Sequence, residues 1–122
     1  MLHSTKADHF HASLEDVKPR VVVVEGRAEV GAKEVLGPFL KLVDASLLAE
    51  KARTVTVDIR KLTFMSSSCF KDFVVWLSDL TNRPPEQRYR IQFLSSAKVR
   101  WQRGSLSSLS CFALDLVDIV EA

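Results

Sequence analysis

Residues 54–77 read TVTVDIRKLTFMSSSCFKDFVVWL and combine a strand pattern, a serine-rich turn and a helix pattern. Apolar and polar residues alternate over residues 54–60, which predicts a β-strand. Apolar residues then recur at three- and four-residue intervals over residues 68–81, which predicts an amphipathic helix. The turn between them, residues 66–69, consists of three serines and a cysteine. This stretch therefore predicts a strand that ends at a hydroxyl-rich turn and leads directly into a helix.

Further strand and helix patterns lie on both sides of this stretch. The β-branched run after Arg20 is typical of a central strand covered on both faces, and residues 9–14 alternate like a short edge strand. Within the helical pattern that follows, Gly37-Pro38 marks either a kink or the start of the helix, and we favour a start with Pro38 in the first turn. The expected elements are strands at 9–14, 20–30, 54–60, 89–94 and 114–120 and helices at 32–52, 68–81 and 96–109, after a loose N-terminus at 1–8.

The element order β-β-α-β-α-β-α-β predicts an α/β fold with a mixed sheet of about five strands. A chain of 122 residues has the length of one domain, residues 1–122. Its formal net charge is +2, so the overall charge favours neither a nucleic acid nor a membrane surface as partner. No apolar run approaches the roughly 20 residues of a membrane-spanning helix, and no secretory signal is recognisable.

The chain also lacks sequence motifs that are typical of an enzyme. The glycines are scattered rather than gathered in a phosphate-binding loop, and no two carboxylates stand in an acid–base arrangement. Cys69 and Cys111 lie far apart, which predicts reduced thiols in a cytoplasmic protein. His9 and His11 share one strand face, but two ligands without a third are weak grounds for a metal site. We therefore expect no catalytic activity, no metal and no cofactor.

The serines at 66–68 have two interpretations. Serine is a preferred N-cap residue and stabilises a helix by about 1 kcal/mol relative to alanine. One serine is enough for that role, yet three follow one another here. A phosphoserine at a helix N-terminus would be tolerated because the helix dipole and free backbone N–H groups oppose its negative charge. The residues alone favour capping as the default and do not say which serine would be modified.

The same stretch resembles the signature segment of STAS domains, the family of anti-sigma factor antagonists. In that segment a strand leads into a loop of the type F-[IM]-D-S-S-G-[LIV], which opens a helix. Phe64 and Met65 match the first two positions, Ser67 stands at the phosphoacceptor position and Ser68 at the second serine. The resemblance covers residues 20–120 and implies a STAS-like domain.

Two residues depart from the family loop, since Ser66 replaces its aspartate and Cys69 its glycine. Lys71 follows the loop closely, and two tryptophans are present, Trp76 and Trp101. With these features and the two departures, the sequence is closest to the SiaC-type STAS-like regulatory phosphoproteins of bacteria. Proteins of that group are switched by a kinase–phosphatase pair and bind a partner, such as a diguanylate cyclase, when they are unphosphorylated.

The resemblance implies a phosphorylation-switched protein–protein interaction module of bacterial signalling. Ser67 is the expected phosphoacceptor, with Ser66 and Ser68 as neighbours that shape recognition. The expected partners are a serine/threonine protein kinase, a metal-dependent serine phosphatase, and a downstream protein that is an anti-sigma factor or resembles a diguanylate cyclase. The residues expected to contact partners are Ser66, Ser68, Cys69, Lys71, Asp72 and Val75.

Three other functions are compatible with parts of the sequence. The helix N-terminus could bind a small anionic ligand, with the serines as hydroxyl donors, which would make the domain a sensor. Residues 83–103 carry six basic residues against one acidic residue, so a nucleic-acid surface is a further alternative. A solvated sheet edge or an acidic protein partner explains that charge better, and Asp115, Asp118 and Glu121 are expected to pair with part of it. Finally, Cys69 at a helix N-terminus could be nucleophilic, but no base is expected near it.

Overall fold

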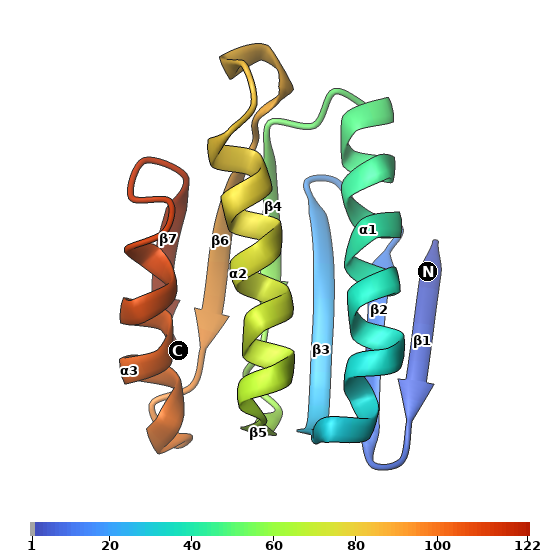
Figure 1. Ribbon diagram of the computed structural model, residues 1–122, viewed down its shortest axis with the longest axis vertical. Helices are drawn as coiled ribbons and strands as arrows, with labels where there is room; N and C mark the ends of the chain where they lie inside the picture. The colour runs from blue at the N-terminus through green and yellow to red at the C-terminus, as the bar shows by residue number, and fades with distance from the viewer. Residues whose placement is uncertain (1) are drawn as a thin grey trace.

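The computed structural model describes residues 2–122, in which seven strands form one mixed sheet and three α-helices lie on one of its faces (Figure 1). The sheet order is β1-β2-β3-β4-β6-β7, and β5 pairs with the last residues of β3. The elements are β1 (His3–Ala7), β2 (Phe10–Glu15), β3 (Arg20–Ala28), α1 (Lys33–Ala49), β4 (Thr54–Asp58), β5 (Leu62–Met65), α2 (Ser67–Thr81), β6 (Arg90–Ser95), α3 (Arg100–Ser110) and β7 (Val117–Glu121), with 3-10 helices η1 (Val30–Ala32) and η2 (Pro85–Gln87). In residues 2–122 no helix has both the length and the apolar character needed to cross a membrane.

The carboxyl ends of the parallel strands all lie along the same side of the sheet. β1–β2 and β2–β3 are antiparallel pairs, whereas β3–β4, β4–β6, β6–β7 and β3–β5 are parallel. The connections between parallel strands therefore run through helices, as the alternating sequence pattern predicts. α1 and α2 both begin at the edge where β3 and β5 end (Figure 1). The predicted α/β fold with a mixed sheet is confirmed.

The core fills the space between the sheet and the three helices. In the central strands, residues that face the helices are fully buried, whereas Val21 and Val23 on the opposite face of β3 are only partly buried. The expectation that this strand is covered on both faces was wrong. β-branched residues stabilise a strand in either environment, so four consecutive valines do not reveal that one face lacks a helix. Residues that face the helices include Val22, Val24, Val55, Val57, Ile91 and Phe93.

The N-terminal region forms a strand where the sequence suggested none. β1 pairs with β2 through a hairpin in which Ala7 lies opposite Phe10, and β2 also pairs with β3. The expectation of a loose segment at 1–8 was therefore wrong for residues 3–7, and the edge strand is β1 instead of β2. Met1 lies outside the described residues. The second hairpin residue, His9, has a positive φ of 60°, which a histidine adopts less readily than a glycine.

Two further boundaries differ from the sequence prediction. α1 already begins at Lys33, so Pro38 lies inside the helix and the expected start at Pro38 was wrong. The helix continues through the proline because its apolar stripe is buried against the sheet. The predicted strand 54–60 ends at Asp58, and a separate β5 follows a short turn. β1 and β5 account for the difference between the expected five strands and the observed seven.

The turn between β4 and β5 is fixed by one buried side chain of α3. The amide nitrogen of Gln102 donates to the carbonyl oxygens of Ile59 and Leu62, at 2.6 and 3.0 Å. Its amide oxygen accepts from the backbone N–H of Ser96 at 2.9 Å. Gln102 is fully buried, so all three hydrogen bonds are shielded from water. α3 thereby sets the path of the chain that leads into β5 and the serine turn.

Candidate partner-binding site at the start of α2

The serine turn lies at the sheet edge where β3 and β5 end. β5 runs parallel to β3, with Met65 opposite Ala28. The backbone N–H of Ser66 then donates to the carbonyl oxygen of Ala28 at 2.7 Å, and α2 begins with the next residue. This last hydrogen bond fixes the first turn of α2 against the end of a central strand. The turn is therefore presented at the edge of an α/β sheet where binding sites are usually found.

Ser66 is the N-cap residue of α2. Its backbone is extended, and its side-chain oxygen accepts a hydrogen bond from the Cys69 backbone N–H at 3.2 Å. The carbonyl oxygen of Ser66 also accepts from the backbone N–H of Phe70 at 2.9 Å. Both bonds are those of a standard serine cap. The capping role that the sequence allowed for any of the three serines thus belongs to Ser66.

Ser67 is exposed at the first position of α2. Among residues 2–122 its hydroxyl makes no hydrogen bond, so the fold does not depend on it. The backbone N–H groups of Ser67 and Ser68 lie in the first helical turn, where no carbonyl of the same helix can accept from them. Lys71 is exposed four residues later and therefore projects from the same side of the helix as Ser67. A negative group on Ser67 would meet two amides, the positive helix end and one ammonium group.

The residue that follows the serines, Cys69, is fully buried. Its thiol donates to the carbonyl oxygen of Glu29 at 3.4 Å, and burial raises the pKa of that thiol. A neutral, inaccessible thiol is a poor nucleophile. The expectation that Cys69 contacts a partner does not agree with its burial, because its side chain packs in the core. Its position four residues before the core residue Phe73 was the signal for this, since both lie on the buried face of the helix.

The other predicted contact residues differ in their exposure. Lys71 and Val75 are exposed on α2, and Ser68 is half-buried. Only 12% of the Asp72 side chain is exposed, and its Oδ1 accepts a hydrogen bond from Lys33 Nζ of α1 at 2.9 Å. Lys71 and Val75 are thus accessible to a partner without any rearrangement. Asp72 faces the neighbouring helix.

Residues of β3, β5 and η1 lie beside this turn, and no pattern in the sequence indicates that β3 and η1 do so. The exposed Phe64 of β5 lies opposite Arg27 of β3, whose guanidinium carbon is 4.9 Å from the ring centroid. η1 contacts the start of α2 and exposes 69% of Val30. Lys33 Nζ also lies 3.4 Å from the carbonyl oxygen of Ser68. Lys33 therefore contacts the serine turn directly, while Arg27, which is ion-paired with Glu29 at 2.9 Å, lies over the Phe64 ring beside it. We refer to Arg27, Val30, Phe64, Ser67, Lys71 and Val75 as the switch surface.

Three of the six basic residues in segment 83–103 are paired with carboxylates of the same chain. Arg90 pairs with Asp118 and Arg103 with Glu121, both at 2.8 Å, as the sequence predicted. The same prediction was wrong for the side chain of Asp115, since only its backbone carbonyl oxygen accepts from Arg90. Arg83 pairs with Asp44 of α1. Arg88 donates to two backbone carbonyl oxygens. These side chains therefore do not form a continuous basic strip that would suit a nucleic-acid backbone.

The histidine pair expected to share a strand face is divided between two elements. His9 lies in the hairpin turn and only His11 lies in β2. Within residues 2–122, no three histidine, cysteine, aspartate or glutamate side chains are grouped as a metal site would require. The alternative function as a sensor of an anionic ligand would use the same amides of Ser67 and Ser68, and it stays a prediction.

Comparison with solved structures assigns the fold. The chain is similar to an anti-sigma factor antagonist from Mycobacterium paratuberculosis, known from its crystal structure, with a TM-score of 0.59 over 93% of this chain and 89% of that chain. The chain has a STAS-like fold. The two sequences are 16% identical, so this similarity concerns the fold alone. The sequence matches no protein-family model and no curated protein.

The STAS-like fold agrees with the expectation drawn from the serine loop and its flanking elements. The strand that ends at Met65, the turn at 66–68 and the helix from Ser67 follow one another as the loop pattern predicts. The narrower resemblance to SiaC-type regulators stays a prediction, as does the modification of Ser67.

Proposed function

We propose that this STAS-like chain is a phosphorylation-switched protein-interaction module whose phosphoacceptor is Ser67. The observation that supports this most is the division of roles between adjacent serines. Ser66 caps α2, whereas the Ser67 hydroxyl is exposed and makes no hydrogen bond in the described residues. A kinase can therefore modify Ser67 without removing a contact that the fold needs. Ser68 is half-buried and less accessible.

The electrostatics of the turn support a phosphate at this position. A phosphoserine carries roughly −1.5 to −2 charges at neutral pH. At the first position of α2 that charge meets the positive end of the helix dipole. Lys71 lies one turn further along the same side, an arrangement in which an acidic group and a following lysine attract each other. The phosphorylated chain should therefore stay folded, so the modification changes the surface and leaves the fold intact.

The switch surface has the mixed character of a protein-binding site. Val30, Phe64 and Val75 supply exposed apolar area, and Lys71 adds a positive charge beside it, whereas the charge of Arg27 is paired with Glu29. We infer that a downstream protein binds this surface when Ser67 is unmodified. A phosphate would place a strongly hydrated dianion at the centre of the contact, where burying it costs binding free energy. Phosphorylation would then release the partner, and dephosphorylation would restore binding.

The proposal includes the partners that the resemblance implies. These are a serine/threonine kinase, a metal-dependent serine phosphatase and a downstream protein of the anti-sigma factor or diguanylate cyclase kind. The similar solved structure is itself described as an anti-sigma factor antagonist. In this arrangement the chain acts by binding other proteins.

Mapping the phosphate in the native host tests the proposal. Tryptic cleavage after Lys61 and Lys71 gives a peptide of residues 62–71 that contains all three serines. Tandem mass spectrometry of this peptide should place a phosphate on Ser67, and the phosphate should be absent in Ser67→Ala. Ser66→Ala is the matched control and should keep the phosphate on Ser67. An unmodified peptide under all growth conditions, or a phosphate on Ser66 or Ser68 alone, would contradict the assignment.

A further inference from the structure

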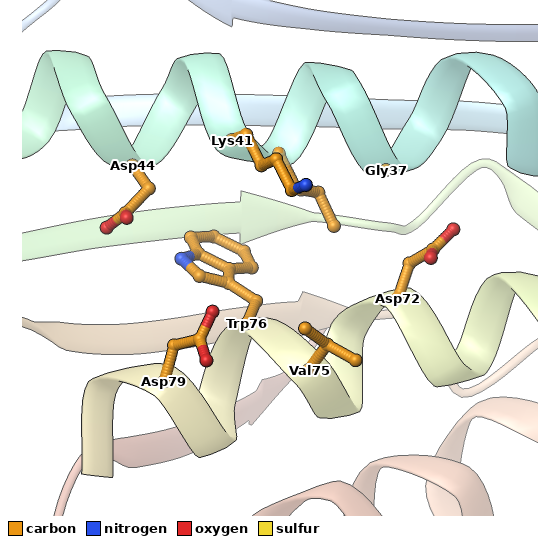
Figure 2. A pocket seen from close by; sticks show the side chains of 8 residues that line it. Gly37, Lys41, Asp44, Asp72, Val75, Trp76 and Asp79 are labelled. Carbon is orange, nitrogen blue, oxygen red and sulfur yellow. The ribbon is translucent and has the colours of Figure 1, made fainter. Parts of the chain in front are cut away.

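A small groove lies between α1 and α2, beside the switch surface. Figure 2 shows its lining side chains, which come from facing stripes of the two helices. Its volume is about 70 Å³, well below the roughly 300 Å³ of the smallest usual metabolite sites. The size suits one side chain of another protein better than a small molecule. The lining residues are Gly37, Leu40, Lys41 and Asp44 of α1. α2 contributes Asp72, Val75, Trp76 and Asp79.

The groove combines an apolar floor with an acidic rim. Leu40 and Trp76 are buried beneath it, and the Trp76 ring lies between the two helices (Figure 2). Three of its lining residues are aspartates, and the single lining cation is Lys41. Asp44 is paired with Arg83, and one carboxylate oxygen of Asp72 is paired with Lys33. Arg83 and Lys33 do not themselves line the groove. Asp79 is the rim carboxylate without an ion pair among residues 2–122, so an occupant that carries hydrogen-bond donors on an apolar stem complements this lining.

One carboxylate oxygen of the rim has no donor. Asp72 Oδ2 is buried and makes no hydrogen bond among residues 2–122, although Oδ1 accepts from Lys33. Figure 2 shows this carboxylate directed toward α1 near Gly37, where a side chain larger than hydrogen would come within 3.4 Å of it. A buried carboxylate oxygen without a donor is destabilising. A rotation of the Asp72 side chain toward the groove would let this oxygen accept from a donor outside the chain.

The groove is continuous with the switch surface. Ser68, Asp72, Val75 and Asp79 are spaced by four, three and four residues and therefore share one side of α2. Asp72 follows Ser67 by five residues, which is about 7.5 Å along the helix axis. Val75 belongs to both surfaces. A protein that touches Ser67 can therefore reach the groove with one long side chain.

We propose that the groove receives an arginine side chain of the docking partner, with the guanidinium donating to Asp72 Oδ2 and its plane against Trp76. Arginine is favoured over lysine because its planar fork has several donors, is weakly hydrated and stacks on aromatic rings. This inference rests on the proposed function in that the occupant belongs to the partner of the switch surface. It adds the chemistry by which that partner is recognised.

The test is a titration of the full unphosphorylated chain, followed by ¹H–¹⁵N NMR spectra, with N-acetyl-arginine amide as the probe. We expect saturable shifts of the Trp76 indole N–H and the Gly37 and Val75 amides. N-acetyl-citrulline amide has nearly the same shape without the charge and should shift none of them. N-acetyl-lysine amide should bind several-fold more weakly. Equal shifts with any two of the three probes, or no saturable shift with arginine, would overturn the proposal.

Three variants test whether the NMR shifts arise from binding of the probe in the groove. Asp72→Asn should weaken the arginine probe about tenfold, because a hydrogen bond to a charged group is lost. The exposed Asp115→Asn removes the same charge far from the groove and should bind like the wild type. Val75→Lys, at an exposed position, brings a cation of the chain itself to the groove and should also weaken the probe. Unchanged binding in both Asp72→Asn and Val75→Lys would refute the site.

The result of this titration is independent of whether the proposed function is correct. The titration needs no kinase, phosphatase or phosphate, so it reports on the groove alone. Absence of arginine binding together with a phosphate on Ser67 would remove the groove and leave the switch. Arginine binding in a chain that is never phosphorylated would remove the switch and leave the groove.

Discussion

The Ser66 hydroxyl accepts the Cys69 backbone N–H at 3.2 Å, so α2 is capped by the residue just before the exposed Ser67. The helix start and the proposed phosphoacceptor are thereby assigned to different serines. This separation lets the surface at Ser67 change its charge while the hydrogen bonds of the helix terminus stay in place.

The division of roles predicts unequal effects of two adjacent substitutions. Ser66→Ala removes the cap and should lower the free energy of unfolding by about 1 kcal/mol. Ser67→Ala removes an exposed hydroxyl that makes no hydrogen bond in the described residues, so the change should stay within about 0.5 kcal/mol. Urea denaturation of the two variants and the wild type measures both values. A larger loss in Ser67→Ala than in Ser66→Ala would show that the cap is misassigned.

Gln102 should be a major determinant of stability. Gln102→Leu keeps the approximate size of the side chain but leaves the carbonyl oxygens of Ile59 and Leu62 and the N–H of Ser96 without their partner. Each unsatisfied buried group is destabilising by roughly 1–3 kcal/mol, so we expect a total loss above about 2 kcal/mol. Gln92→Leu, at an exposed position of β6, is the control and should change stability little. Similar denaturation midpoints for the two variants would contradict this role.

Gly26 is required by the hairpin that precedes β3. It has a positive φ of 93°, and a Cβ at this position would lie 2.0 Å from the carbonyl oxygen of His9. Gly26→Ala should therefore destabilise the chain by well over about 1 kcal/mol. In contrast, a Cβ at Gly31 would meet no atom within 4 Å, so Gly31→Ala should be nearly neutral. Thermal unfolding separates the two cases, and a neutral Gly26→Ala would mean that β1 and β2 are not held as described.

Asp44 should make stability depend on pH. Burial raises the pKa of this carboxyl group, but hydrogen bonds from Arg83 and Tyr89 outweigh it and bring the pKa below its usual value. A lowered pKa in the folded state stabilises the fold above the unfolded pKa of about 3.9, and this contribution is lost as the pH falls through the folded pKa. Asp44→Asn should therefore be destabilising by about 1–3 kcal/mol at pH 7, with a smaller difference from wild type at pH 3.

The control for this pH effect is Asp118→Asn, which removes one carboxylate of an exposed ion pair with Arg90. Exposed ion pairs stabilise by less than about 1 kcal/mol, so the effect of this variant should be small at either pH. Urea denaturation at pH 7 and pH 3 compares both variants with the wild type. A constant difference between Asp44→Asn and the wild type at the two pH values would rule out the lowered pKa.

Local patterns in the sequence were sufficient to predict α2 and its surroundings. The serines at its start and the pair Pro84-Pro85 after its end mark the limits of this helix. The predicted bounds therefore agree with the observed ones to within one residue. The predicted strand at 89–94 is also present, as β6, with Phe93 buried in the core. Capping residues and strong periodicity act over a few residues, so their consequences can be inferred without knowing the fold.

Features that depend on contacts across the sheet could not be predicted in this way. β1 is held by pairing with β2, and its own residues are mostly polar, so no apolar alternation marks it as a strand. The exposure of Val21 and Val23 depends on which face of the sheet the helices cover. The burial of Asp72 depends on the close approach of α1 at Gly37. Likewise, Arg27 and Val30 reach the serine turn only because β3 and β5 are neighbours.

The proposed switch is tested most directly by comparing partner binding with phosphoserine at two positions. Phosphoserine is incorporated at Ser67 in one sample and at Ser107, exposed on α3, in the other. The partner co-purified with the unmodified chain is then titrated against each sample by calorimetry. Phosphoserine at 67 should weaken binding at least tenfold, with no change for phosphoserine at 107. Equal affinities of the unmodified chain and the chain phosphorylated at Ser67 would contradict the proposed switch.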